Sequence, residues 1–183
     1  MMILHKTKTS AGQISEKRTM LKKIISGGQV GAEQAALDVA INLGISHGGW
    51  ISKAPGTKVG ALPNKYKLKE ISPPGYLEST EQNVIDSDAT LVISRGGLTE
   101  KSLFILKFAK QHKKEFLHID LEINRGFSAA QLVKSWIAAN KIQVLNVSGP
   151  SASNDQKIYE DTVSLLKAVN CLFHLNCCES SFI

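Results

Sequence analysis

The sequence predicts a single doubly wound α/β domain with a mostly parallel β-sheet. Short apolar runs alternate with longer segments in which apolar residues recur every three or four positions. The first pattern is typical of buried strands and the second of helices that pack on a sheet, so their alternation predicts βα units. The chain has 183 residues, 43% of them hydrophobic, which is enough to fill one globular core.

The first elements are a strand and a helix. Residues 21–26 form an apolar run that leads into two glycines, as expected for a buried strand entering a tight turn. Residues 31–43 place small apolar side chains on one helical face, and Gly44 ends this helix. Residues 45–75 are rich in glycine and proline, so we predict mostly loop there, with room for a short strand near 47–51.

Regular alternation resumes after this loop. Helices are predicted at about 76–87, from the turn at 95–99 to about 112, at 128–139 and at about 155–173, and strands at 89–94, 116–120 and 142–147.

We expect the folded domain to span residues 21–175. Residues 1–20 are polar and basic without apolar periodicity, and we expect a disordered or non-native tail there. Residues 176–183 are expected to be a C-terminal tail. Residues 1–23 hold six lysines and arginines against one glutamate, which leaves the rest of the chain only +1 of the total charge of +6. Because no basic face is visible on the body, we expect no nucleic-acid binding by the domain.

Compartment and metal binding are constrained by the cysteines. The three cysteines all lie between residues 171 and 178 and cannot cross-link the body of the domain, which favours a reducing compartment, the cytoplasm. Together with His174 they match no standard zinc spacing, so we expect no metal site, although contact with a metal stays open. No apolar run approaches the roughly 18 residues of a membrane-spanning helix, and we expect no membrane association.

Three predicted strands end in glycine-containing turns that lead into helices, at residues 26–31, 94–99 and 148–151. The carboxyl ends of parallel strands meet at one edge of a sheet, and glycine turns followed by helix N-termini suit anions there. Neither a dinucleotide nor a triphosphate fingerprint is present, so the sequence predicts only a phosphate-bearing small ligand. The candidate binding residues in these turns are Gly27, Gly28, Gln29, Gly31, Arg95, Gly96, Gly97, Thr99, Gly149, Pro150 and Ser151.

Four blocks of residues, at 26–38, 47–50, 81–91 and 145–150, resemble the molybdenum carrier family. This family is part of a wider Rossmann-like group that also contains nucleotide-binding proteins and lysine-decarboxylase-like phosphoribohydrolases. The resemblance implies a Rossmann-like fold, a homodimer or homotetramer, and binding of the molybdenum cofactor (molybdopterin), a pterin that carries a phosphate. It also implies that Gln29 and Asn83 contact the pterin while the glycine turns hold the phosphate.

The sequence departs from the family pattern in both the first and the second turn. Val30 stands where the family has threonine, and Glu33 stands where it has aspartate. In the second turn, Glu100 and Lys101 introduce charge where the family has small residues and threonines. Leu103 occupies the position of the glutamate with which the phosphoribohydrolases assist bond cleavage, and leucine cannot do acid–base work.

We therefore expect a non-catalytic binder, with the molybdenum cofactor as the named ligand and a nucleotide-like phosphate ligand as the other choice. The alternative is an enzyme that acts on a nucleoside or nucleotide as an N-glycosidic hydrolase, with Glu81, Asp88 or Glu100 as its acid. A third reading is an interaction module that uses the basic tail.

Overall fold

The computed structural model of the chain describes residues 21–52, 64–72 and 75–175. It contains one six-stranded sheet with the strand order β3-β2-β1-β6-β4-β5, in which every pair of neighbours is parallel. The strands are β1 (Lys23–Ile25), β2 (Ser46–Ile51), β3 (Leu68–Glu70), β4 (Ala89–Ser94), β5 (Glu115–Asp120) and β6 (Val144–Ser148). The helices are α1 (Ala32–Asn42), α2 (Tyr76–Ile85), α3 (Glu100–Gln111), α4 (Gly126–Ala139) and α5 (Ile158–Leu175), with a short 3₁₀ helix, η1 (Asn64–Tyr66). The predicted Rossmann-like, doubly wound α/β fold is confirmed.

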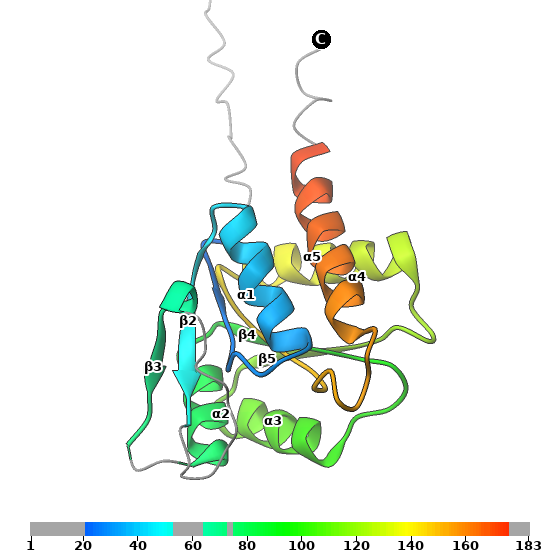
Figure 1. The fold of residues 1–183 in the computed structure, drawn as a ribbon. Coiled ribbons are helices and arrows are strands. Elements are labelled where there is room, and N and C mark those ends of the chain that lie inside the picture. Colours follow the sequence, from blue (N-terminus) through cyan, green and yellow to red (C-terminus); the bar gives the residue numbers. More distant parts are fainter. Residues whose placement is uncertain (1–20, 53–63, 73–74, 176–183) are drawn as a thin grey trace, which may run out of the picture.

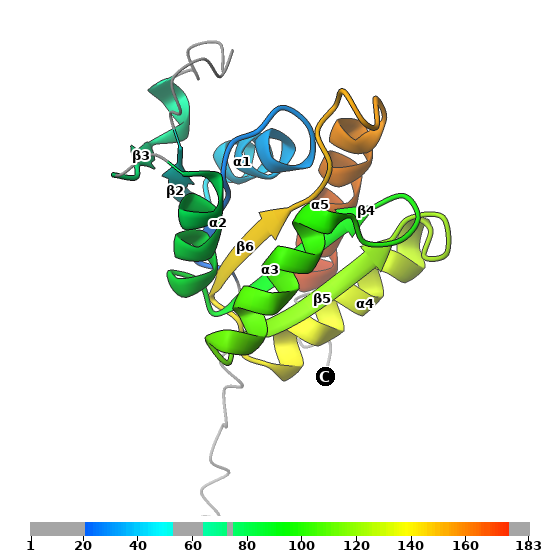
Figure 2. The same cartoon turned by 90° about the horizontal axis from the view of Figure 1, so that it is seen from below.

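The helices form two layers, one on each face of the sheet. Figure 1 shows α1, α4 and α5 above the sheet and α2 and α3 below it, and Figure 2 shows the lower layer from outside. The larger core cluster lies under α1, α4 and α5, where the alanines of α1 are fully buried and let this helix approach the sheet closely. The cluster under α2 and α3 has only four fully buried members, Val84, Val92, Ile105 and Ala109. The α2–α3 face is therefore the thinner of the two.

The segment at 45–75 contains more regular structure than its composition predicts. β2 begins at Ser46, and β3 was not predicted. β3 has only three residues, Leu-Lys-Glu, and pairs with β2 alone at the edge of the sheet. Such a short edge strand needs neither β-branched residues nor alternation, so the sequence carries no signal for it.

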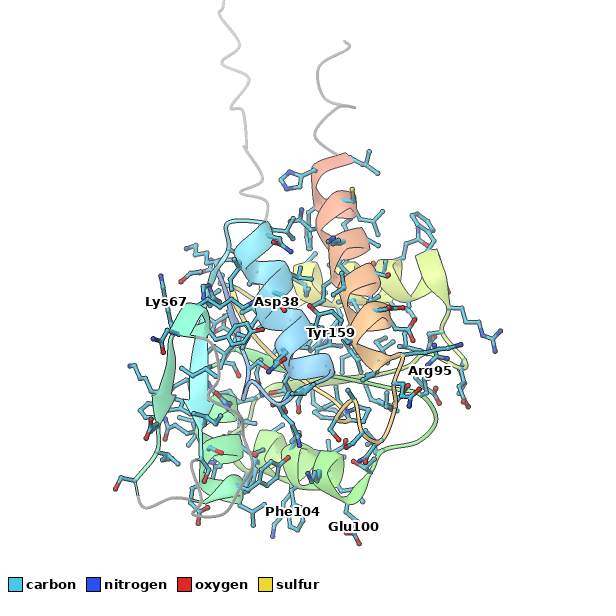
Figure 3. All side chains as sticks on the ribbon, in the orientation of Figure 1. Asp38, Lys67, Arg95, Glu100, Phe104 and Tyr159 are labelled. Atoms are coloured by element: carbon cyan, nitrogen blue, oxygen red, sulfur yellow. The ribbon has the colours of Figure 1, made fainter. Side chains whose placement is uncertain are left out.

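Asp38 on α1 ties η1 to the helix layer above the sheet. Its carboxylate accepts bonds from Lys65 Nζ at 2.7 Å, Tyr66 Oη at 3.2 Å and Tyr159 Oη at 2.7 Å. Burial alone would raise the pKa of Asp38, but these bonds together hold it below its usual value. The bond to Asp38, with burial, raises the pKa of Tyr159 to about 12. Figure 3 shows Asp38 and Tyr159 on neighbouring helices, so the start of β3 is anchored to both α1 and α5.

Several expectations concern residues outside this description. The tails at 1–20 and 176–183, and with them Cys177 and Cys178, lie outside the described residues. Cys171 is exposed on α5. Within residues 21–52, 64–72 and 75–175, no helix combines the length and apolar character needed to cross a bilayer. The same residues contain no group of three or more His, Cys, Asp and Glu side chains that could hold a metal ion.

Replacing Gly149 with alanine is expected to destabilise the fold. A Cβ at this position would lie 2.4 Å from the carbonyl oxygen of Ile93 and 2.7 Å from Cβ of Ala32, so the end of β6 would have to move away from both. We expect the free energy of unfolding in urea to fall by about 1–3 kcal/mol. Gly97→Ala is the matched control because its Cβ would meet nothing within 4 Å. Equal stability of the two variants would contradict this packing account.

Candidate functional site

A cavity of about 660 Å³ opens at the carboxyl edge of the sheet, on the α2–α3 face. The turn after β1, the end of β2, the end of β6 with the loop after it, α2 and the first turns of α3 form its wall. From β1 the chain passes outward to β2 and β3, whereas β4 and β5 lie on the opposite side, so the cavity lies at the switch point of the sheet. This is the place at which open α/β sheets bind ligands.

Glu33, in the first turn of α1, presents a carboxyl group to this cavity. The residue is buried, with 7% of its surface exposed. Oε2 accepts a bond from the backbone N–H of Gln29 at 3.0 Å, and Oε1 accepts one from Ser148 Oγ at 2.9 Å. Burial raises the pKa of Glu33 above its usual value, although these two bonds and the charge of Lys101 act in the opposite direction.

The position of Glu33 depends on the glycine at 27. A Cβ there would lie 2.7 Å from Oε2 of Glu33, so a larger residue would push the carboxyl group away from the turn. The carboxyl group also takes up the N–H of Gln29, one of the donors of the turn at 26–31. A phosphate bound at this turn would therefore meet an acidic group and compete with it for that donor.

The rim of the cavity carries a cation and a phenol. Lys101 Nζ lies 4.9 Å from the centroid of the Tyr76 ring, a cation–π contact. Burial, together with the negative charge of Glu33, raises the pKa of Tyr76 to about 12, so its hydroxyl group stays protonated.

Several hydroxyl groups lie in the remaining wall, most of whose surface is apolar. Ser151 Oγ and Ser153 Oγ lie 2.7 Å apart in the loop after β6. Ser52 Oγ, at the end of β2, is buried and has no hydrogen-bond partner among the described residues. A buried hydroxyl group without a partner in the wall of a cavity is what a site for a polar ligand would contain.

The structure brings the first and third predicted turns together. Of the predicted residues, Gly27, Gln29, Asn83 and Ser151 line the cavity. Gly31, at a φ of 128°, forms an isolated antiparallel bridge with Ser151, and Ala152 N donates to the carbonyl oxygen of Val30 at 2.8 Å. Gly28, Gly149 and Pro150 lie in the same two turns, and Pro150 O accepts a bond from Ala32 N at 3.4 Å.

The second turn lies apart from this cavity. Arg95 is paired with Asp161, and its Nε lies 3.6 Å from Oδ2 of Asp155, so its side chain turns toward α5 (Figure 3). There it lines a second cavity, of about 650 Å³, on the α4–α5 side. Within the same turn, Gly96 N donates to Asp120 Oδ1 at 2.9 Å, and Thr99 caps α3 by accepting a bond from Ser102 N. The wall of the first cavity contains none of the predicted residues of this turn, Arg95, Gly96, Gly97 and Thr99. It does contain Lys101, from the first turn of α3.

Asn83 uses its amide group to hold β2 against α2. Oδ1 accepts a bond from Trp50 N at 2.8 Å, and Nδ2 donates to Trp50 O at 2.9 Å. The Trp50 indole donates to Asp86 Oδ2 at 2.7 Å, which adds a second link between the same elements. Asn83 therefore positions the cavity wall through the backbone of β2.

The acids considered for catalysis lie elsewhere. Glu81 Oε1 lies 2.7 Å from His112 Nε2, in a contact between α2 and α3. Asp88 Oδ2 accepts the backbone N–H of Gln143 and of Val144, at the amino edge of the sheet. Glu100 is exposed at the start of α3 and points away from the sheet (Figure 3). Among the described acidic residues, the cavity wall contains Glu33 alone.

Comparisons with known proteins bear on this arrangement. The circularly permutated YpsA SLOG family matches residues 24–170. A crystal structure of the Putative molybdenum carrier protein from Syntrophus aciditrophicus SB is 46% identical to the chain, with a TM-score of 0.78, and the match covers 81% of this chain and 94% of that one. The structure of (E)-4-hydroxy-3-methyl-but-2-enyl diphosphate reductase is 15% identical, with a TM-score of 0.35 over 80% of this chain and 59% of that one, and carries no argument. No curated protein matches the sequence.

Truncating Asn83 to alanine is expected to loosen β2. Both bonds to Trp50 are lost and its backbone groups are left without these partners, so we expect the free energy of unfolding to fall by about 2–4 kcal/mol. The control is the neighbouring substitution Gln82→Ala, which removes an exposed hydrogen bond from Gln82 to Asp86. It should lower the free energy of unfolding by less than about 1 kcal/mol. Urea denaturation of both variants is the measurement, and a cost for Asn83→Ala no greater than that of the control would show that the amide does not clamp the strand.

Stability should also respond to the buried carboxyl group. Because the pKa of Glu33 is raised above 4.5, the native state holds a proton that the unfolded state releases between that value and the native pKa, so wild-type stability falls as the pH rises through this window. Glu33→Gln removes this dependence, and we expect its Tm to exceed that of the wild type by roughly 2–4 °C at pH 8 and by less at pH 4.5. Lys101 and Tyr76 face the same carboxyl group, and Tyr76, whose pKa is raised to about 12, stays protonated over this range. A Tm difference that is constant with pH would overturn the assignment.

Proposed function

Because the chain belongs to the circularly permutated YpsA SLOG family, we propose that it is a carrier of the molybdenum cofactor, which it binds in the cavity at the carboxyl edge of the sheet without converting it to a product. The name of the 46% identical relative supports a carrier role. The observation that carries the proposal is the cavity itself, which combines a buried carboxyl group, a cationic rim and several hydroxyl groups in a mostly apolar wall at the switch point of the sheet. Its volume of about 660 Å³ lies within the range of small-molecule sites.

The wall suits a ligand with a polar ring and a phosphate. Lys101 at the rim supplies a positive charge, and the hydroxyl groups of Ser151 and Ser153 are donors that could bond phosphate oxygens. The hydroxyl group of Ser52, which has no hydrogen-bond partner among the described residues, could bond a ring substituent. Arg95 is engaged with Asp161 outside this cavity, so we give it no part in the binding.

The remaining expectations are part of the same proposal. We propose a homodimer or homotetramer, a cytoplasmic location and no binding of nucleic acid by the domain; the family resemblance supports the first, and the cysteine and charge patterns support the others. Each stays a prediction.

An N-glycosidic hydrolase acting on a nucleoside or nucleotide is the second candidate. It is favoured by the placement of Glu33, because a buried carboxyl group whose pKa is raised can serve as a general acid. A carrier should bind its ligand without product, whereas a hydrolase should release free base from nucleoside monophosphates, which chromatography detects. Release that disappears in Glu33→Gln would favour the enzyme.

The carrier proposal predicts that Lys101→Ala weakens binding of the molybdenum cofactor. Removing one charge from the rim should raise the Kd about 5- to 10-fold, as measured by anaerobic native mass spectrometry with cofactor added in graded amounts. The matched control is Lys107→Ala, which removes the same charge from an exposed position on α3 that does not line the cavity. An unchanged Kd for Lys101→Ala would remove Lys101 from the site, and no binding by the wild-type protein would overturn the proposed function.

A further inference from the structure

We propose that Glu33 recognises one edge of the ligand's ring by hydrogen bonds, and that the cavity binds a 2-amino-4-oxopyrimidine, the ring that pterins and guanine share. This inference rests on the proposed function only in placing a ligand in this cavity. It sets which way the ligand points, with the ring inward against Glu33 and the phosphate outward at the rim.

The carboxyl group has capacity for two more hydrogen bonds. A carboxylate oxygen can accept two bonds, and among the described residues each oxygen of Glu33 accepts one, from Gln29 N and from Ser148 Oγ. One acceptor position therefore remains on each oxygen of a side chain that lines the cavity. A pair of parallel N–H donors would fill both positions at once, in the two-pronged geometry that arginine uses with carboxylates.

A 2-amino-4-oxopyrimidine presents such a pair. Its ring N–H and the neighbouring amino group lie side by side on one edge and point in the same direction. Adenine offers an amino donor beside a ring acceptor, and this acceptor would face a carboxylate oxygen. The carboxyl group should therefore discriminate between the two kinds of ring. Two acceptors that face each other in a buried site lose more binding free energy than a contact that is merely absent.

The surroundings hold the carboxyl group ready for such a partner. The two bonds to Gln29 and Ser148 fix its position before any ligand arrives, and the absence of a side chain at Gly27 leaves room for it. Burying a carboxylate without enough donors is unfavourable, and two ligand N–H groups would offset that cost. The positive charge of Lys101 acts in the same direction.

The same geometry opposes the reverse orientation. A phosphate at the turn after β1 would lie beside Glu33 and would compete for the N–H of Gln29. At the rim, by contrast, it would meet Lys101 and the paired hydroxyl groups of Ser151 and Ser153. Glu33 and Lys101 therefore divide the site into a ring end and an anion end.

The test is a calorimetric titration of the full-length chain with each of three probes, 6-hydroxymethylpterin, GMP and AMP. We expect the pterin, GMP or both to bind at least about 10-fold more tightly than AMP. Glu33→Gln, which replaces one acceptor oxygen with a donor, should weaken the binding of the preferred probe by about 10-fold or more and reduce the discrimination against AMP. Glu33→Asp, which keeps the charge but shortens the reach, should give an intermediate loss.

Glu100→Gln is the matched control, since it makes the same chemical change at an exposed position outside the cavity and should bind like the wild type. A melting curve for each variant verifies that it is folded. A preference for GMP over the pterin that depends on Glu33 would support the inference while removing the molybdenum cofactor as the ligand. Tight binding of AMP, unchanged affinity in folded Glu33→Gln, or no binding of any of the three probes would overturn the inference. The cofactor titration of the wild type judges the proposed function separately.

Discussion

The close approach of the turn after β1 to the loop after β6 is the constraint on which the rest of the site depends. Ser26 Oγ donates a buried hydrogen bond to the carbonyl oxygen of Val147 at 2.7 Å. The bridge between Gly31 and Ser151 joins the same two segments a few residues later in each. β1 contributes only three residues to the sheet, so these contacts add to its ladders with β2 and β6 in fixing its carboxyl end. The wall that holds Glu33 is built from this junction.

The two faces of the sheet differ in that one covers most of the core and the other adjoins the cavity. The face under α1, α4 and α5 holds most of the buried apolar side chains, which supply most of the hydrophobic stabilisation. The α2–α3 face holds a much smaller cluster, and the cavity occupies the space beside it. A cavity on the thin face takes little space from the larger core cluster, which explains how a domain of this size can keep a cavity of about 660 Å³.

The sequence predicts the fold better than the site. Buried strands and the alanine-rich helix are local patterns, and they are present as expected, whereas β3 is too short to leave a pattern. Glycine marks the turns, so Gly27 and Gly31 could be found, but their partners could not. Glu33 is held in its buried position partly by Ser148, and Arg95 is paired with Asp161 outside the first cavity. Both contacts join residues far apart in the chain, and no local pattern reports them.

The hydrogen bonds of Asp38 to η1 have a consequence for how much the length and sequence of the chain can vary between β2 and η1. On one side of this interval β2 is held by Asn83, and on the other η1 is held by Asp38, so each end has its own anchor among the described residues. The entropy of closing a loop grows only with the logarithm of its length, about 0.6 kcal/mol for each doubling. Insertions or exchanges between residues 52 and 64 should therefore be tolerated by the edge of the sheet. Natural variation or a designed library could be directed to this interval at little expense to folding.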